Sequence, residues 1–212
     1  MPQTPVRPRR VITYVDGFNL YFGLRDSGYQ RYFWLDLMKL SVSLARPSDQ
    51  VEAVKYFTAL ISGPPAKQRR QANYLEAMQE HLGGDLEIIH GRYQTENRMC
   101  QKCRATWPVS SEKKTDVNIA VEMMVDAFSD AFDSATVISA DSDLVPPILA
   151  IRRLFPEKSI VVALPPGRHS FELRQAANAS FTIGRAKFRD AQLPESVQKA
   201  NGTVLRRPPE WG

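Results

Sequence analysis

Four aspartates in three separated segments are the residues of this chain best suited to chemistry. Each lies where an apolar, strand-like run ends or where a helical pattern begins: Asp16, Asp116, Asp141 and Asp143. Ligands of an open parallel α/β sheet bind beyond the carboxyl ends of its strands, so that fold would bring the four acids to one rim. At about 4 Å and an effective dielectric near 20, each pair of carboxylates repels by roughly 4 kcal/mol. A divalent cation relieves this repulsion, and the cluster therefore predicts a metal-dependent enzyme that acts on phosphodiesters.

Each acid also has a structural alternative. Asp116 and Asp143 stand in the first turn of a predicted helix, where a carboxylate interacts favourably with the helix dipole. Asp16 precedes a glycine, as turn aspartates commonly do. Asn19 lies three residues beyond Asp16, where its amide could orient a metal-bound water or a phosphate oxygen, or could cap the next helix. Oxygen ligands of this kind suit Mg²⁺ or Mn²⁺.

The strongest helical pattern spans residues 115–132, and its helical wheel places Asp116 at the edge of the apolar arc. We expect the residues of that arc to be buried, among them Val117, Val121, Val125 and Phe128. We expect the later acids of the same helix, such as Asp126, to face solvent.

Apolar runs alternate with helical patterns along most of the chain. Predicted strands span residues 11–15, 51–60, 86–90, 135–139 and 159–164, with an edge strand at 181–183. Predicted helices span residues 35–44, 66–82, 115–132, 144–154 and 170–177. This alternation predicts an α/β fold of three layers, with a mostly parallel sheet of five or six strands covered on both faces.

The chain has 212 residues, 43% of them hydrophobic, which suits one globular domain. We expect that domain to span residues 11–190, between a flexible basic tail (1–10) and a disordered or loosely docked C-terminal tail (191–212). The apolar runs are strand-sized, so no membrane span is expected. Two cysteines are too few for a disulfide framework and favour the cytoplasm, while the net charge of +5 weakly favours a polyanionic partner.

Three motifs in this order resemble the NYN domain, which belongs to the PIN-like nucleases related to LabA and DUF88 proteins: VDGFNLY, KTDVNIAVEMMVDA, and ISADSDL followed by a PPI helix. The resemblance runs over about residues 11–190. It implies a PIN-like Rossmannoid fold and RNA cleavage that depends on Mg²⁺ or Mn²⁺. It also implies that Asp16, Asp116, Asp141 and Asp143 bind metal and that Asn19 assists. Ala140 is a departure, because the family usually has glycine there.

Two groups of residues are candidates for nucleic-acid binding. Lys113 and Lys114 adjoin Asp116 and could meet substrate phosphates. Arg168, His169 and Ser170 follow the fifth strand and lead into a helix, whose free backbone N–H groups could hold a phosphate. A plain loop is the alternative for the second group.

Residues 91–114 are expected to be an irregular insertion, too long for an ordinary connection. Within it, Cys100 and Cys103 have the spacing of half a zinc site, and His90 is the nearest further ligand. A structural Zn²⁺ would order the insertion. A metal-free cysteine pair is the alternative.

These residues together predict a metal-dependent ribonuclease, endonucleolytic on single-stranded or structured RNA. Two alternatives stay open: a non-catalytic RNA-binding or regulatory module, and a metal-dependent DNA flap nuclease or phosphatase that uses the same acids. The sequence contains no Walker A loop, no Gly-x-Ser-x-Gly elbow and no Gly-x-Gly-x-x-Gly fingerprint. The expected partner is RNA, with no membrane, and a homodimer is left open.

Overall fold

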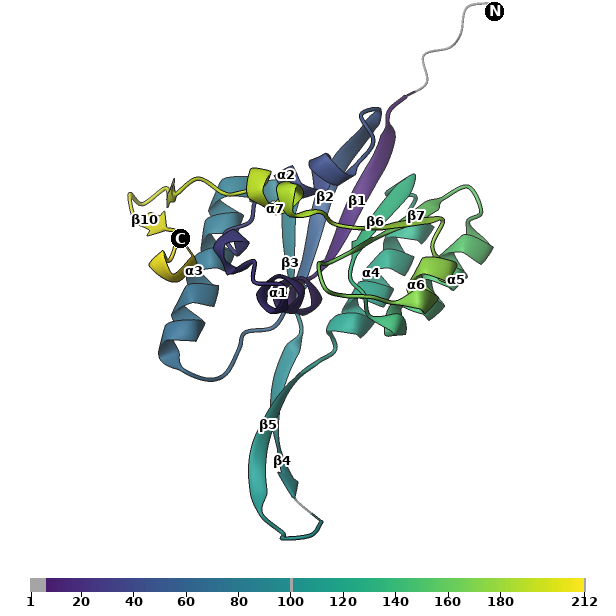
Figure 1. The fold of residues 1–212 in the computed structure, drawn as a ribbon. Coiled ribbons are helices and arrows are strands. Elements are labelled where there is room, and N and C mark those ends of the chain that lie inside the picture. Colours follow the sequence, from purple (N-terminus) through teal and green to yellow (C-terminus); the bar gives the residue numbers. More distant parts are fainter. Residues whose placement is uncertain (1–6, 100, 212) are drawn as a thin grey trace, which may run out of the picture.

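A parallel sheet of six strands forms the centre of the computed structural model, which describes residues 7–99 and 101–211, with the backbone alone for 92–98 and 107–113 (Figure 1). In spatial order the strands are β3 (Leu86–His90), β2 (Asp49–Thr58), β1 (Arg9–Asp16), β6 (Ser134–Ile138), β7 (Ser159–Leu164) and β8 (Ala179–Thr182). Every neighbouring pair is parallel. The predicted three-layer α/β fold with five or six strands is confirmed, and its form is that of a PIN-like Rossmannoid domain.

The strand order reverses between β1 and β6, which are paired with Val15 opposite Ile138. The chain runs from β1 to β2 and β3 on one side, and from β6 to β7 and β8 on the other. Such a switch point leaves a crevice beyond the carboxyl ends of the two central strands. Asp16 ends β1, and Ser139 follows the last residue of β6.

Helices cover both faces of the sheet, and each face has its own apolar core. One face carries α1 (Gly17–Asp26), α2 (Leu37–Leu44), α3 (Pro65–Leu82) and α7 (Arg185–Asp190). The other carries α4 (Thr115–Phe128), α5 (Val145–Leu154) and α6 (Phe171–Ala176). Side chains alternate along a strand, so Val15 and Val54 pack toward α1 to α3 while Tyr14 and Phe57 pack toward α4. Short 3₁₀ turns complete the fold: η1 (Gln30–Tyr32), η2 (Gly83–Asp85), η3 (Ser142–Leu144) and η4 (Pro209–Trp211).

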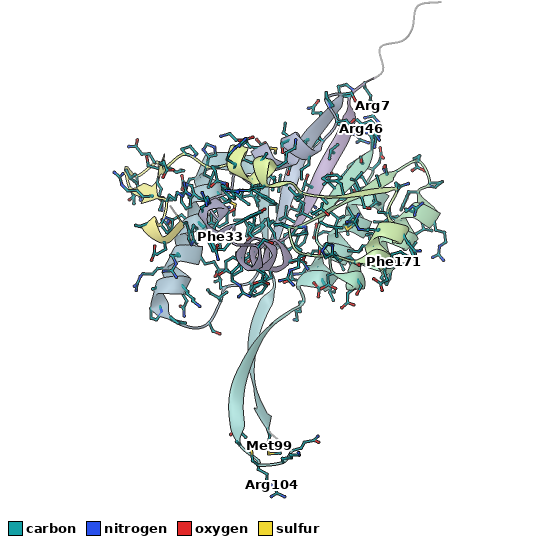
Figure 2. All side chains as sticks on the ribbon, viewed as in Figure 1. Arg7, Phe33, Arg46, Met99, Arg104 and Phe171 are labelled. Atoms are coloured by element: carbon teal, nitrogen blue, oxygen red, sulfur yellow. The ribbon has the colours of Figure 1, made fainter. Side chains whose placement is uncertain are left out.

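Within residues 91–114, the segments 92–99 and 106–113 form an antiparallel hairpin, so the expectation of an irregular insertion is wrong. Its strands are β4 (Arg92–Met99) and β5 (Thr106–Lys113), paired with Met99 opposite Thr106. The hairpin projects from the side of the body where β3 ends and α4 begins (Figure 1). Figure 2 places Met99 and Arg104 at its far tip. Polar strands of this kind lack the apolar alternation that marks a strand in sequence.

Residues 194–211 are packed against the body, which corrects the expectation of a disordered or loosely docked tail. Leu193, Val197 and Leu205 lie in the core beside α3. The segment forms a small hairpin of β9 (Ser196–Gln198) and β10 (Val204–Arg206) and ends in η4. The indole N–H of Trp34 donates to the carbonyl of Pro194 at 2.7 Å.

The burial of α4 differs from its helical wheel. Asp126, expected to face solvent, is 7% exposed, whereas the residues expected to be buried are 52–66% exposed: Val117, Val121, Val125 and Phe128. The hydroxyl of Tyr14 donates to Asp126 at 2.6 Å, and the ammonium of Lys55 lies 2.8 Å from the same carboxylate. A buried cation and a buried hydroxyl on the sheet thus turn the acidic side of the helix inward, which an apolar wheel cannot anticipate.

No helix in the described part of the chain is both long and apolar enough to cross a membrane.

Candidate metal centre

Asp16 is held at the junction of β1 and α1. The alternation of β1 points its side chain toward the face covered by α4, where it is 4% exposed. One carboxylate oxygen, Oδ1, accepts a hydrogen bond from the backbone N–H of Asn19 at 2.9 Å and so caps α1. The structural alternative for Asp16, a helix or turn contact, therefore holds for Oδ1, while the other oxygen, Oδ2, accepts a hydrogen bond from Ser139.

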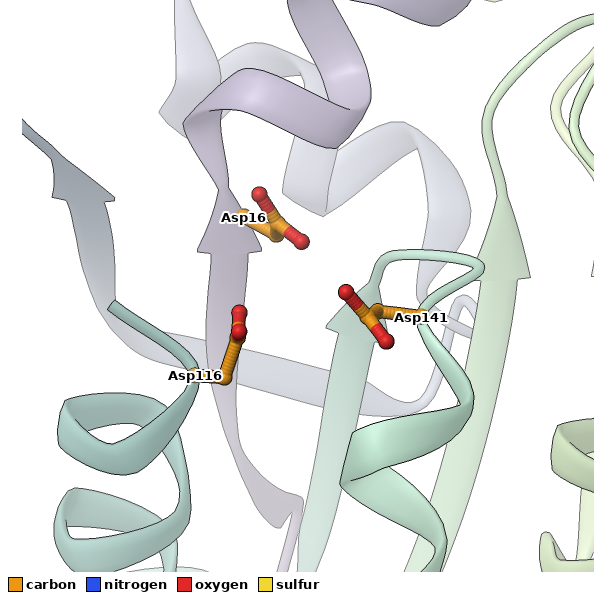
Figure 3. Close-up of side chains that lie close together, drawn as sticks. All are labelled: Asp16, Asp116 and Asp141. Carbon is orange, nitrogen blue, oxygen red and sulfur yellow. The ribbon is translucent and has the colours of Figure 1, made fainter. Parts of the chain in front are cut away.

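Asp116 and Asp141 reach the same crevice from other segments. Asp116 is the second residue of α4, and Asp141 precedes η3 in the loop after β6. One carboxylate oxygen from each of Asp16, Asp116 and Asp141 lies within 4.8 Å of the other two. In Figure 3 the three carboxylates reach into one space from the end of β1, the start of α4 and the loop after β6.

Asp143 lies outside this group of three. It is exposed, and its backbone N–H donates to Asp141 Oδ1 at 3.0 Å. Its charge still acts on the site, because it contributes to the raised pKa of Asp116. Three of the four predicted acids are thus brought together, with the fourth at their edge.

Ser139 organises the cluster and was missed by the sequence analysis. Its hydroxyl is fully buried, donates to Asp16 Oδ2 at 2.9 Å and accepts from the backbone N–H of Asp141 at 3.0 Å. Asn19 acts in parallel, since its side-chain oxygen accepts from the backbone N–H of Ala140 at 3.1 Å. These two side chains fix the loop after β6 to the start of α1. In this structure Asn19 is a positioning residue for the loop that carries Asp141.

The electrostatics of the cluster disfavour ionisation. Burial is the main reason that the pKa of Asp16 rises to about 6; the hydrogen bonds from Asn19 and Ser139 oppose this rise, and the charges of Asp116 and Asp141 add to it. Burial also raises the pKa of Asp116, with the charges of Asp141 and Asp143 next in importance. None of the ion pairs between described residues includes Asp16, Asp116 or Asp141.

The donor set fits a hard divalent cation. Carboxylate oxygens are the protein ligands that Mg²⁺ and Mn²⁺ prefer, and two oxygens on opposite sides of one Mg²⁺ lie about 4 Å apart. The observed limit of 4.8 Å between the three oxygens is close to that spacing. Thr115, which precedes Asp116 in the sequence, has a buried hydroxyl without a hydrogen-bond partner among the described residues.

The predicted nucleic-acid residues lie just before α4 and in the loop between β7 and α6. Lys114 is exposed and adopts a left-handed conformation (φ 77°), uncommon outside glycine, just before α4. The side chain of Lys113 lies outside the described part. Arg168 is paired with Asp26 at 2.7 Å, His169 is exposed, and Ser170 accepts from the N–H of Leu173 to cap α6.

The predicted zinc ligands do not converge in the described part of the chain. Cys100 lies outside the described residues, while Cys103 is exposed near the tip of the hairpin. His90 is exposed at the end of β3, where the hairpin begins. Zinc binding by Cys100, Cys103 and His90 stays a prediction.

The fold and the acidic crevice define a PIN-like nuclease domain. Residues 10–184 match the NYN domain, and this chain belongs to the NYN domain family. That family is of nuclease type, its members generally depend on divalent metal, and nucleic acid is the substrate that such a domain implies.

One curated protein and one solved structure are also similar to this chain. It is 32% identical over 180 residues to 6-hydroxy-3-succinoylpyridine 3-monooxygenase HspA of Pseudomonas putida (strain DSM 28022 / S16), a match that covers 68% of this chain and 56% of the relative. The chain therefore spans little more than half the length of that curated relative. The crystal structure of VPA0982, a protein of unknown function from Vibrio parahaemolyticus RIMD 2210633, covers 90% of this chain and all of its own, with TM-score 0.57 and 20% identity. This second likeness concerns the fold alone.

Proposed function

We propose that this chain is a ribonuclease that depends on Mg²⁺ or Mn²⁺ and cuts RNA internally. One observation carries the proposal: three carboxylates from separate segments share a crevice at the switch point of the sheet, and none is paired with a cation among the described residues. A protein that left these charges together without a ligand would lose stability to their repulsion. Membership of a nuclease-type family supports the same chemistry.

Each side chain has a distinct role in the proposed reaction. Asp16, Asp116 and Asp141 would hold the ion, and Asp143 would join them as a further ligand at the exposed edge. Ser139 and Asn19 would keep Asp16 and the loop of Asp141 in register. When bound, a divalent cation lowers the pKa of water and offsets charge on a phosphate. Lys113 and Lys114 would meet phosphates of the RNA, and Arg168, His169 and Ser170 would form a secondary contact.

A substrate panel tests this function. Single-stranded RNA, structured RNA, flap DNA and a phosphomonoester are each incubated with Mg²⁺, Mn²⁺ or a chelator. We expect internal cuts in RNA that need the metal and disappear in Asp16→Asn. The matched control is Asp130→Asn, an exposed acid at the other end of the sheet. RNA that is bound and never cut would favour the non-catalytic module, and turnover of DNA flaps or phosphomonoesters alone would favour the third alternative.

The curated relative raises a second candidate, oxidation of a nitrogen heteroaromatic ring. Its name describes a monooxygenase acting on a pyridine, and a monooxygenase consumes O₂ and a reductant. O₂ uptake with 6-hydroxy-3-succinoylpyridine and a nicotinamide reductant tests this candidate. Uptake that requires this chain and persists in Asp16→Asn would replace the nuclease proposal.

Cytoplasmic location and homodimerisation belong to the same proposal. The exposed apolar row on α4 is the surface that a second copy would cover: Val117, Val121, Val125 and Phe128. Light scattering of the purified chain and of Val121→Glu tests homodimerisation. We expect a dimer that the charged variant weakens, and a monomer in both would reject it.

A further inference from the structure

A cavity of about 400 Å³ lies on the face of the sheet that α1 covers. The acidic crevice opens on the other face, toward α4. The cavity is bounded by α1, the end of β2, the start of α3 and η4. This volume falls within the usual range of small-ligand sites. The cavity belongs to none of the roles assigned above.

Aromatic rings line the cavity from three directions. Phe18, Tyr21 and Phe22 occupy one side of α1, at the spacing that places helix residues on a common face. Phe33 stacks on Tyr21 with ring centroids 4.8 Å apart, and Figure 2 places Phe33 beside α1. Trp211 closes the wall from η4, 5.5 Å from the Phe33 ring. Tyr21 is 38% exposed, so part of this aromatic wall is open to an incoming ring.

Positively charged side chains lie among these rings. Arg25 lies over the ring of Phe22, 4.5 Å from its centroid. Lys67 and Arg70 enter from α3, and Arg70 is paired with Glu210 at 2.9 Å. Aromatic faces combined with cations are what proteins use to hold an unpaired base and the phosphates joined to it. The lining therefore suits a planar heteroaromatic ring that carries negative charge nearby.

The cavity begins at the residue after a metal-site carboxylate. Gly17 lines it and directly follows Asp16. A Cβ at Gly17 would lie 2.7 Å from both the Phe57 carbonyl oxygen and the Tyr56 hydroxyl, so the backbone there is pressed against β2. On the neighbouring strand β2, Tyr56 faces α1 and Phe57 faces α4. The carboxyl end of the sheet therefore lies between the cavity and the crevice. A strand lying over this edge would meet both sites.

We propose that the cavity binds one unpaired base of a single-stranded RNA, so that the adjoining backbone crosses the edge of the sheet toward Asp16, Asp116 and Asp141. This inference rests on the proposed function and names the substrate: a strand with an unstacked nucleotide. Bases stack between the rings of α1 and η4, and Arg25, Lys67 and Arg70 face the strand's phosphates. The site then favours unpaired RNA over a continuous duplex, whose bases are not free to enter.

Binding is measured on an Asp16→Asn background, in which the strand stays uncut. The probes are a short fluorescein-labelled single-stranded RNA and the same sugar–phosphate strand without bases, followed by anisotropy. Tyr21→Ala removes a lining ring, Tyr21→Phe keeps it, and Leu149→Ala removes an exposed apolar side chain outside the cavity. Tyr21→Leu serves as a second ring-free variant if Tyr21→Ala unfolds. Free AMP is added as a competitor, with quenching of tryptophan fluorescence compared in Trp211→Phe.

We expect Tyr21→Ala to weaken binding of the RNA at least about fivefold, the lower range for loss of one base–aromatic stack. Tyr21→Phe and Leu149→Ala should bind the RNA with the affinity of the parent. The affinity for the strand without bases should be the same in Tyr21→Ala as in the parent. AMP should displace the RNA. Unchanged RNA affinity in Tyr21→Ala, or AMP that quenches Trp211 without displacing RNA, would overturn the proposal.

Cleavage by the wild-type chain with Mn²⁺ separates this inference from the proposed function. If the wild type cuts RNA and Tyr21→Ala binds and cuts equally well, the base site is wrong and the nuclease stands. If base-dependent binding holds but no RNA is ever cut, the cavity stands and the ribonuclease proposal fails.

Discussion

Acids gather at both ends of the central strands, and the two groups differ in what surrounds them. At the amino end of β1, Arg10 lies 2.9 Å from Asp133 and 3.0 Å from Asp130, and Lys158 also pairs with Asp130. At the carboxyl end, Asp16, Asp116 and Asp141 share a crevice without any such partner among the described residues. The same residue type is thus paired with cations at one end and left unpaired at the other.

The pKa directions follow the surroundings. Hydrogen bonding to Arg10 is the main reason that the pKa of Asp133 lies well below its usual range. Burial and like charges hold the pKa of Asp16 at about 6. The amino-end acids are stabilised by the fold, whereas the carboxyl-end acids are held in place at a cost. That contrast distinguishes a structural ion pair from a site suited to bind a cation.

The largest expected effect is the loss of cleavage in Asp16→Asn. Metal-dependent RNA cleavage should fall at least about a hundredfold, as when one electrostatic stabiliser of a reaction is removed. Asp130→Asn is the matched control and should cut at the wild-type rate, measured by gel assay of a labelled RNA. Equal cleavage by both variants would mean that the two ends of the sheet do not differ in function.

A second prediction concerns pH. The folded-state pKa of Asp16, about 6, lies above its unfolded value of 3.8, so the stability due to this group is fully present below about pH 4 and is lost as the pH rises through about 6. The loss amounts to about 3 kcal/mol in the metal-free protein. Thermal unfolding in chelator across this window should show it, and Mn²⁺ should restore stability above pH 6. A metal-free Asp16→Asn protein should show a smaller fall, due to Asp116, whose pKa is also raised. If the wild type fell no more than this variant, Asp16 would not be the origin.

Asp126→Ala should destabilise the fold without removing the metal site. It takes an acceptor from Tyr14 and a partner from Lys55, both buried under α4, while Glu122 still lies 2.7 Å from Lys55. We expect a loss of about 2 kcal/mol in the free energy of unfolding, below the full cost of breaking a buried pair because one partner remains. Urea unfolding measures the loss. Wild-type stability in this variant would show that the acid is not needed under the helix.

Ser139→Ala tests whether the cluster depends on its positioning hydroxyl. The hydroxyl touches both Asp16 and the backbone of Asp141. Removing such an outer contact typically weakens metal affinity about 10- to 100-fold. Calorimetric titration with Mn²⁺ gives the affinity, and circular dichroism should show an unchanged fold. An unaltered Mn²⁺ affinity would show that the two acids hold their places without it.

The smallest effect is expected for Asp133→Asn. The pKa of Asp133 is lowered, so its contribution to stability is present above the unfolded pKa and is lost as the pH falls below it. Because the pair with Arg10 is partly exposed, the loss at neutral pH should be about 1 kcal/mol or less. Unfolding in urea at neutral and acidic pH measures it, and RNA cleavage should be unchanged. A larger stability loss at acidic pH than at neutral pH would contradict the assignment.

The sheet and the meeting of the three acids could be predicted because both follow from local patterns. Apolar runs such as that of β7 mark buried strands, and the carboxyl ends of parallel strands meet at one edge. Ser139 could not be singled out, since a serine after a strand is common and its contact with Asp16 joins two segments far apart in the sequence. The burial of Asp126 depends on Lys55 and Tyr14, which lie far from it in sequence.

The hairpin and the packed C-terminus escaped prediction for a related reason. The strands β4 and β5 are polar and lack alternation, so only their mutual pairing defines them. Leu193, Val197 and Leu205 are isolated apolar residues whose burial depends on the surface of α3. The cavity formed by α1 and η4 joins segments nearly two hundred positions apart, beyond the reach of spacing rules.

A crystal soaked in Mn²⁺ and measured for anomalous scattering gives the most direct test of the crevice. We predict a peak bounded by the carboxylates of Asp16, Asp116 and Asp141, absent from crystals of Asp16→Asn. Manganese bound elsewhere on the chain, with none between these three side chains, would contradict a metal-dependent site at the carboxyl end of the sheet.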